Sequence, residues 1–330
     1  MDTGLEYDRT FMLLKVDNGP EGRIFMNMHV TRFTEMSLFK TSMSGNTVTV
    51  SYSGPKNDPV PETSMEIPLL PDMSSLKVID VEMHKSPTKA YEMGDQYKAW
   101  FTKQFGYDVL LAYIGPKRRP VLGSLMPAVP SAQGVLSSWL LTALGGKNEE
   151  SETHGITFAD CAHFLIVTEE SLGDCSARLP EGIEMDIRKF RPNVVLAGSP
   201  APWDEDYWGA IKIHRGNDNI EGIDMPLTAN CIRCTSINID YDTGKPGKGE
   251  EGKMLKKLMG DRRVDKGAKY SPIFGRYGYL GKGIGKTINV GDEVEVTKRL
   301  TERTTWGELL VFMSTSFADE WQTGRCDDES

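Results

Sequence analysis

The sequence predicts a mainly β protein, α+β in class and of the barrel type. Short runs of alternating β-branched residues recur along the chain, as at Asn46–Tyr52 (NTVTVSY) and Leu76–Met83 (LKVIDVEM). Such period-two runs are typical of half-buried strands. Helical periodicity is rare by comparison, and many short strands with few helices favour a β-barrel over a doubly wound parallel sheet.

Composition narrows the class of protein. The 330 residues are 39% hydrophobic and 26% charged, and the net charge of -9 argues against broad binding to nucleic-acid phosphates. The longest apolar stretch, Gly134–Gly146, has about 13 residues, whereas a membrane-spanning helix needs roughly 20. Met1–Thr10 is polar, and five cysteines are too few for a disulfide framework. A soluble, intracellular protein is therefore expected.

In the first third, Phe11–Val16 is a further predicted strand. Tyr97, Trp100, Phe101 and Phe105 share one helical face, which indicates a helix packed on a core. Residues 1–115 are assigned to a first domain. The proline-rich residues 116–154 are assigned to a linker or insertion that includes a short amphipathic helix.

The second half resumes with a strand at Phe164–Val167, a helix at Glu170–Arg178 and a buried-type strand at Val194–Ala197. Cys231–Asp240 alternates in the strand manner and ends in a turn at Asp242-Thr243-Gly244. Residues 155–300 are assigned to a second domain and residues 301–330 to a C-terminal extension.

The pair Cys231 and Cys234 admits three interpretations: half of a zinc site, a redox disulfide, or one functional thiol with a neighbour. Structural zinc needs four ligands, and no second pair of Cys or His ligands is present. In a strand, residues three apart lie on the order of 10 Å apart and face opposite ways, too far for a disulfide. Spacing alone favours two small core cysteines over a functional thiol.

A series of motifs favours a functional thiol over two core cysteines. The series resembles the MOSC domain of molybdenum cofactor sulfurases and of the mitochondrial amidoxime-reducing proteins, over roughly residues 155–297. Tyr7-Asp-Arg9 and the strand after it resemble the β-barrel domain that precedes MOSC in these proteins. In order, the motifs are Arg191-Pro-Asn-Val-Val-Leu-Ala-Gly198, Glu205-Asp-Tyr-Trp208, Cys231-x-Arg-Cys234-Thr, Asp240-x-Asp-Thr-Gly244, Ser271-Pro-Ile-Phe-Gly-x-Tyr277 and Ile288-x-Val-Gly-Asp292.

The resemblance implies a molybdenum cofactor, with Cys234 as the thiolate ligand to molybdenum and the catalytic residue. A soft thiolate suits a high-valent metal that dithiolene sulfurs already hold, and a cation such as Arg233 is expected to lower the thiol pKa. The cofactor ends in a phosphate, for which arginine is the natural partner. The positions that match cofactor contacts in the family are Arg9, Arg191, Asn193, Arg233 and Tyr277.

By resemblance, the protein is an oxidoreductase that removes oxygen from N-hydroxylated substrates, with electrons from a flavin reductase through a b-type cytochrome. The alternative is a non-catalytic cofactor-binding or carrier module, or a degenerate domain. In sulfurases, MOSC is fused to an aminotransferase-like domain that binds pyridoxal phosphate, and the barrel-like first third leaves no room for one. Lys117-Arg118-Arg119 could dock an acidic electron donor, although a solvated loop is favoured.

The sequence departs from the family at its start. Relatives carry an earlier strand that ends in a Lys-Ser pair touching the cofactor, whereas only eight residues precede Arg9 here. A first domain shortened at its N-terminus is therefore expected, with a weaker hold on the phosphate. The membrane anchor of the amidoxime-reducing proteins is not predicted either. The chain as given is expected to be cytoplasmic, or to lie at the mitochondrial outer membrane if such an anchor precedes it.

Overall fold

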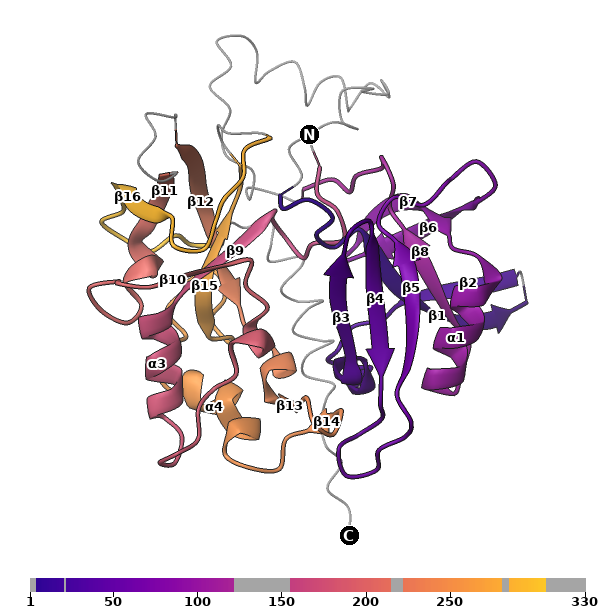
Figure 1. Cartoon of the computed structure of the whole chain (residues 1–330). Coiled ribbons are helices and arrows are strands. Elements are labelled where there is room, and N and C mark those ends of the chain that lie inside the picture. Colours follow the sequence, from indigo (N-terminus) through magenta and orange to yellow (C-terminus); the bar gives the residue numbers. More distant parts are fainter. Residues whose placement is uncertain (1–3, 21, 122–154, 215–221, 281–284, 307–330) are drawn as a thin grey trace.

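The computed structural model describes residues 4–20, 22–121, 155–214, 222–280 and 285–306. Within these ranges the protein is mainly β, as predicted, with a nearly closed barrel-shaped sheet and a half-barrel. Figure 1 shows the two halves side by side, β1–β8 with α1 in one and β9–β16 with α3 and α4 in the other. No helix in the described part of the chain is both long and apolar enough to cross a membrane.

The first half contains a five-stranded sheet in the order β2-β1-β8-β7-β6 and a three-stranded sheet in the order β3-β4-β5, all antiparallel. Helix α1 carries the predicted apolar face, with Tyr97 and Phe101 buried. The elements are β1 Phe11–Gly19, β2 Gly22–Asn27, η1 Thr34–Leu38, β3 Phe39–Ser44, β4 Thr47–Tyr52, β5 Thr63–Pro68, β6 Lys77–Met83, β7 Ser86–Glu92, α1 Asp95–Phe105 and β8 Val109–Tyr113.

The second half contains a six-stranded sheet in the order β10-β9-β15-β12-β11-β16 and the short pair β13-β14. Only β10 and β9 run parallel. The elements are β9 Phe164–Thr168, α3 Glu169–Ala177, η4 Ile187–Phe190, β10 Val194–Leu196, η5 Asp204–Tyr207, β11 Trp208–His214, β12 Ile223–Ile232, η6 Thr235–Asn238, β13 Ile239–Asp240, β14 Lys245–Pro246, η7 Glu251–Lys253, α4 Met254–Leu258, β15 Ile273–Gly278 and β16 Glu293–Arg299.

Most predicted strands are present, but two predictions for the second half are wrong. Cys231–Asp240 is not one strand, because β12 ends at Ile232 and one turn of 3-10 helix, η6, follows Cys234. The residue Asn238 helps to hold this turn, because its side chain accepts a hydrogen bond from the Leu255 amide at 3.0 Å. The strand at Val194 is also not buried, since Val195 is 42% exposed.

Two predicted segments fall mainly outside the described residues. The amphipathic helix in residues 116–154 lies wholly within the part that the structure does not describe. Of the C-terminal extension, only residues 301–306 are described. Within these, Trp306 is buried and its ring packs edge-on against that of Tyr277, so this end of the chain is part of the core of the second half.

A glycine in the motif Ser271-Pro-Ile-Phe-Gly-x-Tyr277 lets two strands approach closely. Gly275 has a φ of +87°, and a Cβ there would lie 2.7 Å from the Ile166 carbonyl oxygen. Any larger residue would both strain the backbone and separate β15 from β9. The glycine is therefore required by the packing that brings Tyr277 into the core.

The two halves are joined by hydrogen bonds between loops. The Thr34 hydroxyl donates to the Gly244 carbonyl at 2.6 Å, and the Lys56 backbone amide donates to the Asp242 carbonyl at 2.7 Å. These contacts hold the turn after β13, which forms as predicted around Asp240. The turn that follows the Cys234 segment is thus fixed from the other half of the molecule.

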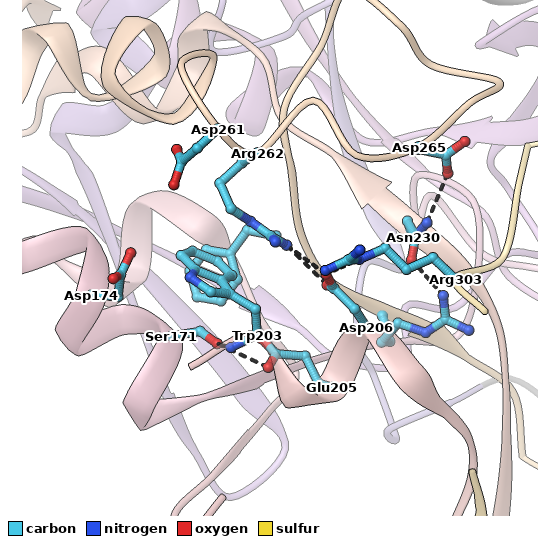
Figure 2. Close-up of polar contacts among 12 residues, drawn as sticks. Ser171, Asp174, Trp203, Glu205, Asp206, Asn230, Asp261, Arg262, Asp265 and Arg303 are labelled. Carbon is cyan, nitrogen blue, oxygen red and sulfur yellow. Dashed lines mark hydrogen bonds and ion pairs between the residues drawn. The ribbon is translucent and has the colours of Figure 1, made fainter. Parts of the chain in front are cut away.

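The motif Glu205-Asp-Tyr-Trp208 forms a buried polar network, shown in Figure 2. The Asp206 carboxylate accepts hydrogen bonds from Arg262 at 2.9 Å and from Arg303 at 2.7 Å. The Arg262 guanidinium also lies 3.9 Å from the centroid of the Trp203 ring. Paired and hydrogen-bonded charges of this kind are tolerated in a core, and they tie the segment around Arg303 to the sheet.

Glu205 differs from its neighbour because no cation in the described ranges forms an ion pair with it. Its Oε2 accepts hydrogen bonds from Ser171 Oγ at 2.8 Å and Thr168 Oγ1 at 3.1 Å. Burial raises the pKa of this carboxyl from 4.5 to about 7. The folded state therefore holds the proton more tightly than the unfolded chain does.

We expect this carboxyl to make stability fall as pH rises from about 4.5 to about 7, because the unfolded chain loses the proton first. Glu205→Gln keeps the neutral form at every pH. It should flatten that part of the profile and raise the free energy of unfolding at pH 8 by about 2–3 kcal/mol. Urea unfolding between pH 4.5 and 8 measures both effects. Asp80→Asn, at a side chain that is 88% exposed, should keep the wild-type slope.

Candidate functional site

The predicted molybdenum ligand, Cys234, lies directly after β12 and is half-buried. Its Sγ is 3.0 Å from Ser236 Oγ. Burial raises the pKa of the thiol above its ordinary value, while the hydrogen bonds with Ser236 and the charge of Arg233 act in the opposite direction. The expected effect of Arg233 is therefore present, but burial outweighs it.

Cys231 and Cys234 are both free thiols. Cys231 is buried, and its Sγ donates to Tyr277 Oη at 3.2 Å. Burial raises the pKa of the Tyr277 phenol well above its ordinary value. Tyr277 thus acts as a neutral hydrogen-bond acceptor for Cys231.

The Arg233 side chain is hydrogen-bonded to the protein backbone. Its side chain donates to the Phe274 carbonyl at 2.9 and 2.8 Å and to the Phe190 carbonyl at 2.8 Å. The guanidinium also lies 5.2 Å and 5.6 Å from the ring centroids of Phe190 and Phe274. Arg233 therefore connects the Cys234 segment to the residue that precedes Arg191.

Arg9, Arg191 and Asn193 meet where the two halves join. Arg9 Nη2 donates to the Arg191 carbonyl at 3.1 Å, and the Arg9 side chain also pairs with Asp8. Asn193 donates to Asp8 Oδ2 at 2.9 Å and accepts from the Leu165 amide at 2.9 Å. Asn193 consequently positions Arg9 through Asp8.

Arg191 is available to a ligand. It is exposed, and its guanidinium makes no hydrogen bond or ion pair within the part of the chain that the structure describes. Its backbone adopts the left-handed conformation, with φ at 55°, as does that of Arg9 at 51°. Two non-glycine residues in this strained region at one junction are consistent with a functional role.

Asp160 was not predicted, although it links the members of the site. Partial desolvation of this half-exposed carboxyl opposes its ionisation, but the hydrogen bond from His84 and the charges of Arg191 and Arg9 outweigh that effect and lower the pKa below its ordinary value. The same carboxylate is electrostatically coupled to Cys234. Its charge therefore acts on the thiol, and the charges of both arginines act on it.

No linear pattern could have identified Asp160, because its partners come from positions 9, 84, 191 and 234. Asp8 lies in the motif Tyr7-Asp-Arg9, in which only the arginine matches a cofactor contact of the family. Tyr241, also coupled electrostatically to Arg191 and Cys234, occupies the variable position of Asp240-x-Asp-Thr-Gly244. Within the described residues, no group of three or more His, Cys, Asp and Glu side chains could hold a metal ion by itself.

Arg119, the last residue of the basic triplet Lys117-Arg118-Arg119, is buried rather than solvated. Arg119 is 1% exposed and donates to the carbonyls of Met83 at 2.9 Å, Thr157 at 3.1 Å and Ala159. Its backbone also pairs with that of Ile156. Arg119 is therefore no docking residue for an electron donor, but the link between the β6–β7 turn and the segment that carries Asp160.

Replacing this guanidinium should strongly destabilise the protein. Arg119→Met leaves several buried carbonyls without a donor, and we expect a loss of about 3 kcal/mol or more in the free energy of unfolding. Arg119→Lys keeps the charge but not the forked donors and should fall in between. Arg188→Met, at an arginine that is 71% exposed, should change stability by less than about 1 kcal/mol. Urea unfolding of the three variants checks this order.

Sequence comparison relates part of the chain to a known domain family. Residues 153–295 match the MOSC domain. The chain is 27% identical over 224 residues to mitochondrial amidoxime reducing component 2 of Rattus norvegicus, covering 67% of this chain and 57% of that protein. It is 32% identical over 143 residues to mitochondrial amidoxime-reducing component 1 of Homo sapiens, covering 42% and 38%. It is 24% identical over 256 residues to the molybdenum cofactor sulfurase of Oryza sativa subsp. japonica, covering 75% and 26%.

These similarities support a role related to the molybdenum cofactor. The chain spans 57% of the length of the rat relative, so the alignment compares parts of the two proteins. The human relative is similar only over 143 residues, 42% of this chain.

Proposed function

The second half of this chain is a MOSC domain, and from that premise we propose that the protein binds the molybdenum cofactor through Cys234 and reduces N-hydroxylated substrates. The observation that carries the proposal is the arrangement at the junction of the two halves. A half-buried thiol and an exposed Arg191, unpaired within the described residues, both interact electrostatically with Asp160, and Arg9 lies beside Arg191.

The residues present fit such a cofactor. One thiolate from Cys234 is a suitable soft ligand, and it must lose its proton to bind a metal. Arg191 offers a free guanidinium and Arg9 a second one for the phosphate end. Asn193 and Asp8 orient Arg9, while Arg233 fixes the backbone on either side of the thiol segment.

The bound group would supply two-electron chemistry, and the chain would supply orientation, charge and exclusion of water. We further propose that electrons come from a flavin reductase through a b-type cytochrome. A mitochondrial location is proposed in line with the names of the amidoxime-reducing relatives. A sulfur-transfer role is the second candidate, because the chain is similar over 256 residues to a molybdenum cofactor sulfurase.

Cys234→Ala should remove bound molybdenum and N-reduction while leaving the fold, because Ser236 is the only hydrogen-bond partner of this side chain among the described residues. Metal analysis of the purified protein and reduction of an N-hydroxylated benzamidine with a dithionite-reduced dye measure the two losses. The matched control is Cys175→Ala, at a buried thiol on α3, which should keep both metal and activity.

Two results would contradict the proposal. Full activity of Cys234→Ala would exclude the thiol as the ligand. A folded wild-type protein that takes up no molybdenum cofactor would favour a degenerate domain, and one that binds the cofactor without N-reduction would favour a carrier module.

A further inference from the structure

A row of aromatic rings leads from the surface of the second half to the segment that carries Cys234. The Trp203 ring packs edge-on against Phe274, with 5.2 Å between the ring centroids, and Phe274 packs edge-on against Phe190 at 4.6 Å. The Arg233 guanidinium lies over both inner rings, 5.2 Å from the centroid of Phe190 and 5.6 Å from that of Phe274. Because Arg233 directly precedes Cys234, the row ends beside the candidate ligand.

The outer end of this row reaches the surface. Phe274 and Phe190 are fully buried, whereas Trp203 is only half-buried. The two residues before it, Ala201 and Pro202, are exposed and have short side chains. A partner molecule can therefore come close to the indole from this side of the chain.

The backbone of Trp203 adopts a conformation that bulky residues rarely take. Its φ is 68°, in the left-handed region, and its amide donates a hydrogen bond to Ser171 Oγ at 2.7 Å. Large side chains in this region are uncommon. Strained residues of this kind cluster at functional sites, so the conformation is a second observation, independent of the ring contacts, that singles out Trp203.

Two cations stabilise the indole electrons. The Arg262 guanidinium lies 3.9 Å from the Trp203 ring centroid, as Figure 2 shows, and the Arg178 guanidinium lies 5.7 Å from it. A cation over an aromatic face attracts the π electrons and so opposes their removal. Trp203 is thus suited to conduct an electron without itself being oxidised. The charge of Arg178 is balanced by Asp174 and Asp261, at 2.6 and 2.5 Å.

We propose that the surface around Trp203 is the docking site of the electron donor, a small haem protein, and that the three rings conduct its electrons to the Cys234 segment. The inference rests on the proposed function. Each docking event oxidises the donor haem by one electron. Two such transfers and two protons balance the cleavage of one N–O bond, and the oxygen leaves as water.

The surface suits such a partner in size and chemistry. Electron-transfer partners form small, transient interfaces, and tryptophan is among the residues that contribute most to binding at interfaces. The edge of a haem is flat and apolar, so it can pack against the indole where Ala201 and Pro202 leave room. The packed rings then provide a continuous path inward, in two steps of 5.2 and 4.6 Å between centroids.

Three variants separate docking from conduction. Ala201→Arg places a long side chain beside the indole and leaves the row of rings intact. Trp203→Leu removes the outer ring, and Trp203→Phe keeps a ring there. Val290→Arg is the matched control, because Val290 is fully exposed in the turn before β16, whereas Asp204, next to Trp203, binds Arg299 at the other end of that strand.

The probe is a soluble b-type cytochrome domain. Its Kd for the cofactor-loaded protein is measured by calorimetry, as a readout independent of turnover. Reduction of N-hydroxylated benzamidine is followed with the reduced cytochrome as the varied electron donor and, separately, with a dithionite-reduced viologen dye, which needs no docking surface. Molybdenum content and circular dichroism verify that each variant is loaded and folded.

We expect Ala201→Arg to raise both the Kd and the KM for the cytochrome by about 10-fold. Trp203→Leu should lower kcat at saturating cytochrome by about 10-fold, with Trp203→Phe in between, while every variant keeps the dye-driven rate within about twofold of the wild type. Val290→Arg should match the wild type with both donors. Should Trp203→Leu fail to fold, Ala201→Arg still decides.

Three results would each overturn the inference: equal losses with dye and cytochrome, an unchanged Kd for Ala201→Arg, or a wild-type protein that does not bind the cytochrome. If the wild type shows no N-reduction even with the dye, the proposed function fails. The effect of Ala201→Arg on the cytochrome Kd then decides by itself for or against the docking surface.

Discussion

The buried guanidinium of Arg119 is the constraint on which the junction of the two halves depends. A guanidinium has five N–H donors in a fixed plane, and here they reach carbonyls on both the β6–β7 turn and the segment before β9. No carboxylate forms an ion pair with it among the described residues, so carbonyl dipoles compensate most of its charge. Movement of either segment would leave this cation poorly solvated, and the two segments are therefore held together.

Arg233, like Arg119, fixes backbone segments through hydrogen bonds to their carbonyls. The chain leaves β12 at Ile232 and must present a thiol without the support of a strand. The guanidinium of Arg233, packed between two aromatic rings and bonded to the carbonyls of Phe190 and Phe274, fixes that exit. This side chain, which matches a cofactor contact in the family, positions the backbone next to the thiol, while Arg191 has a free guanidinium within the described residues.

The alternating pattern of the sequence predicted the fold well, because period-two runs such as Thr47–Tyr52 and Lys77–Met83 do form strands. It failed at Thr235–Ile239, where the same alternation occurs in a 3-10 turn. Ile237 is buried in that turn, as it would be in a strand, but the Asn238 side chain accepts a hydrogen bond from α4 and its carbonyl accepts one from Gly247. Tertiary hydrogen bonds of this kind leave no local signal.

The candidate site was predictable only where its residues lie within contiguous motifs. Cys234, Arg9 and Arg191 belong to such motifs, whereas Asp160, His84 and Arg119 are far apart in the sequence and meet only through the fold. A run such as Lys117-Arg118-Arg119 looks the same whether its last member is solvated or 1% exposed. Burial of a charge depends on partners that the run itself does not contain.

The charged groups at the junction come from both halves of the molecule. Arg9 and His84 come from the first half, and Arg191, Asp160 and Cys234 come from the second. Arg191 provides an unpaired cation suited to a phosphate, and Asp160 provides a half-exposed anion suited to N–H and O–H donors. If the two halves separated, Asp160 would lose His84 and Arg9, two of the neighbours that lower the pKa of its carboxyl. The arrangement of charges at the site therefore depends on contact between the two halves.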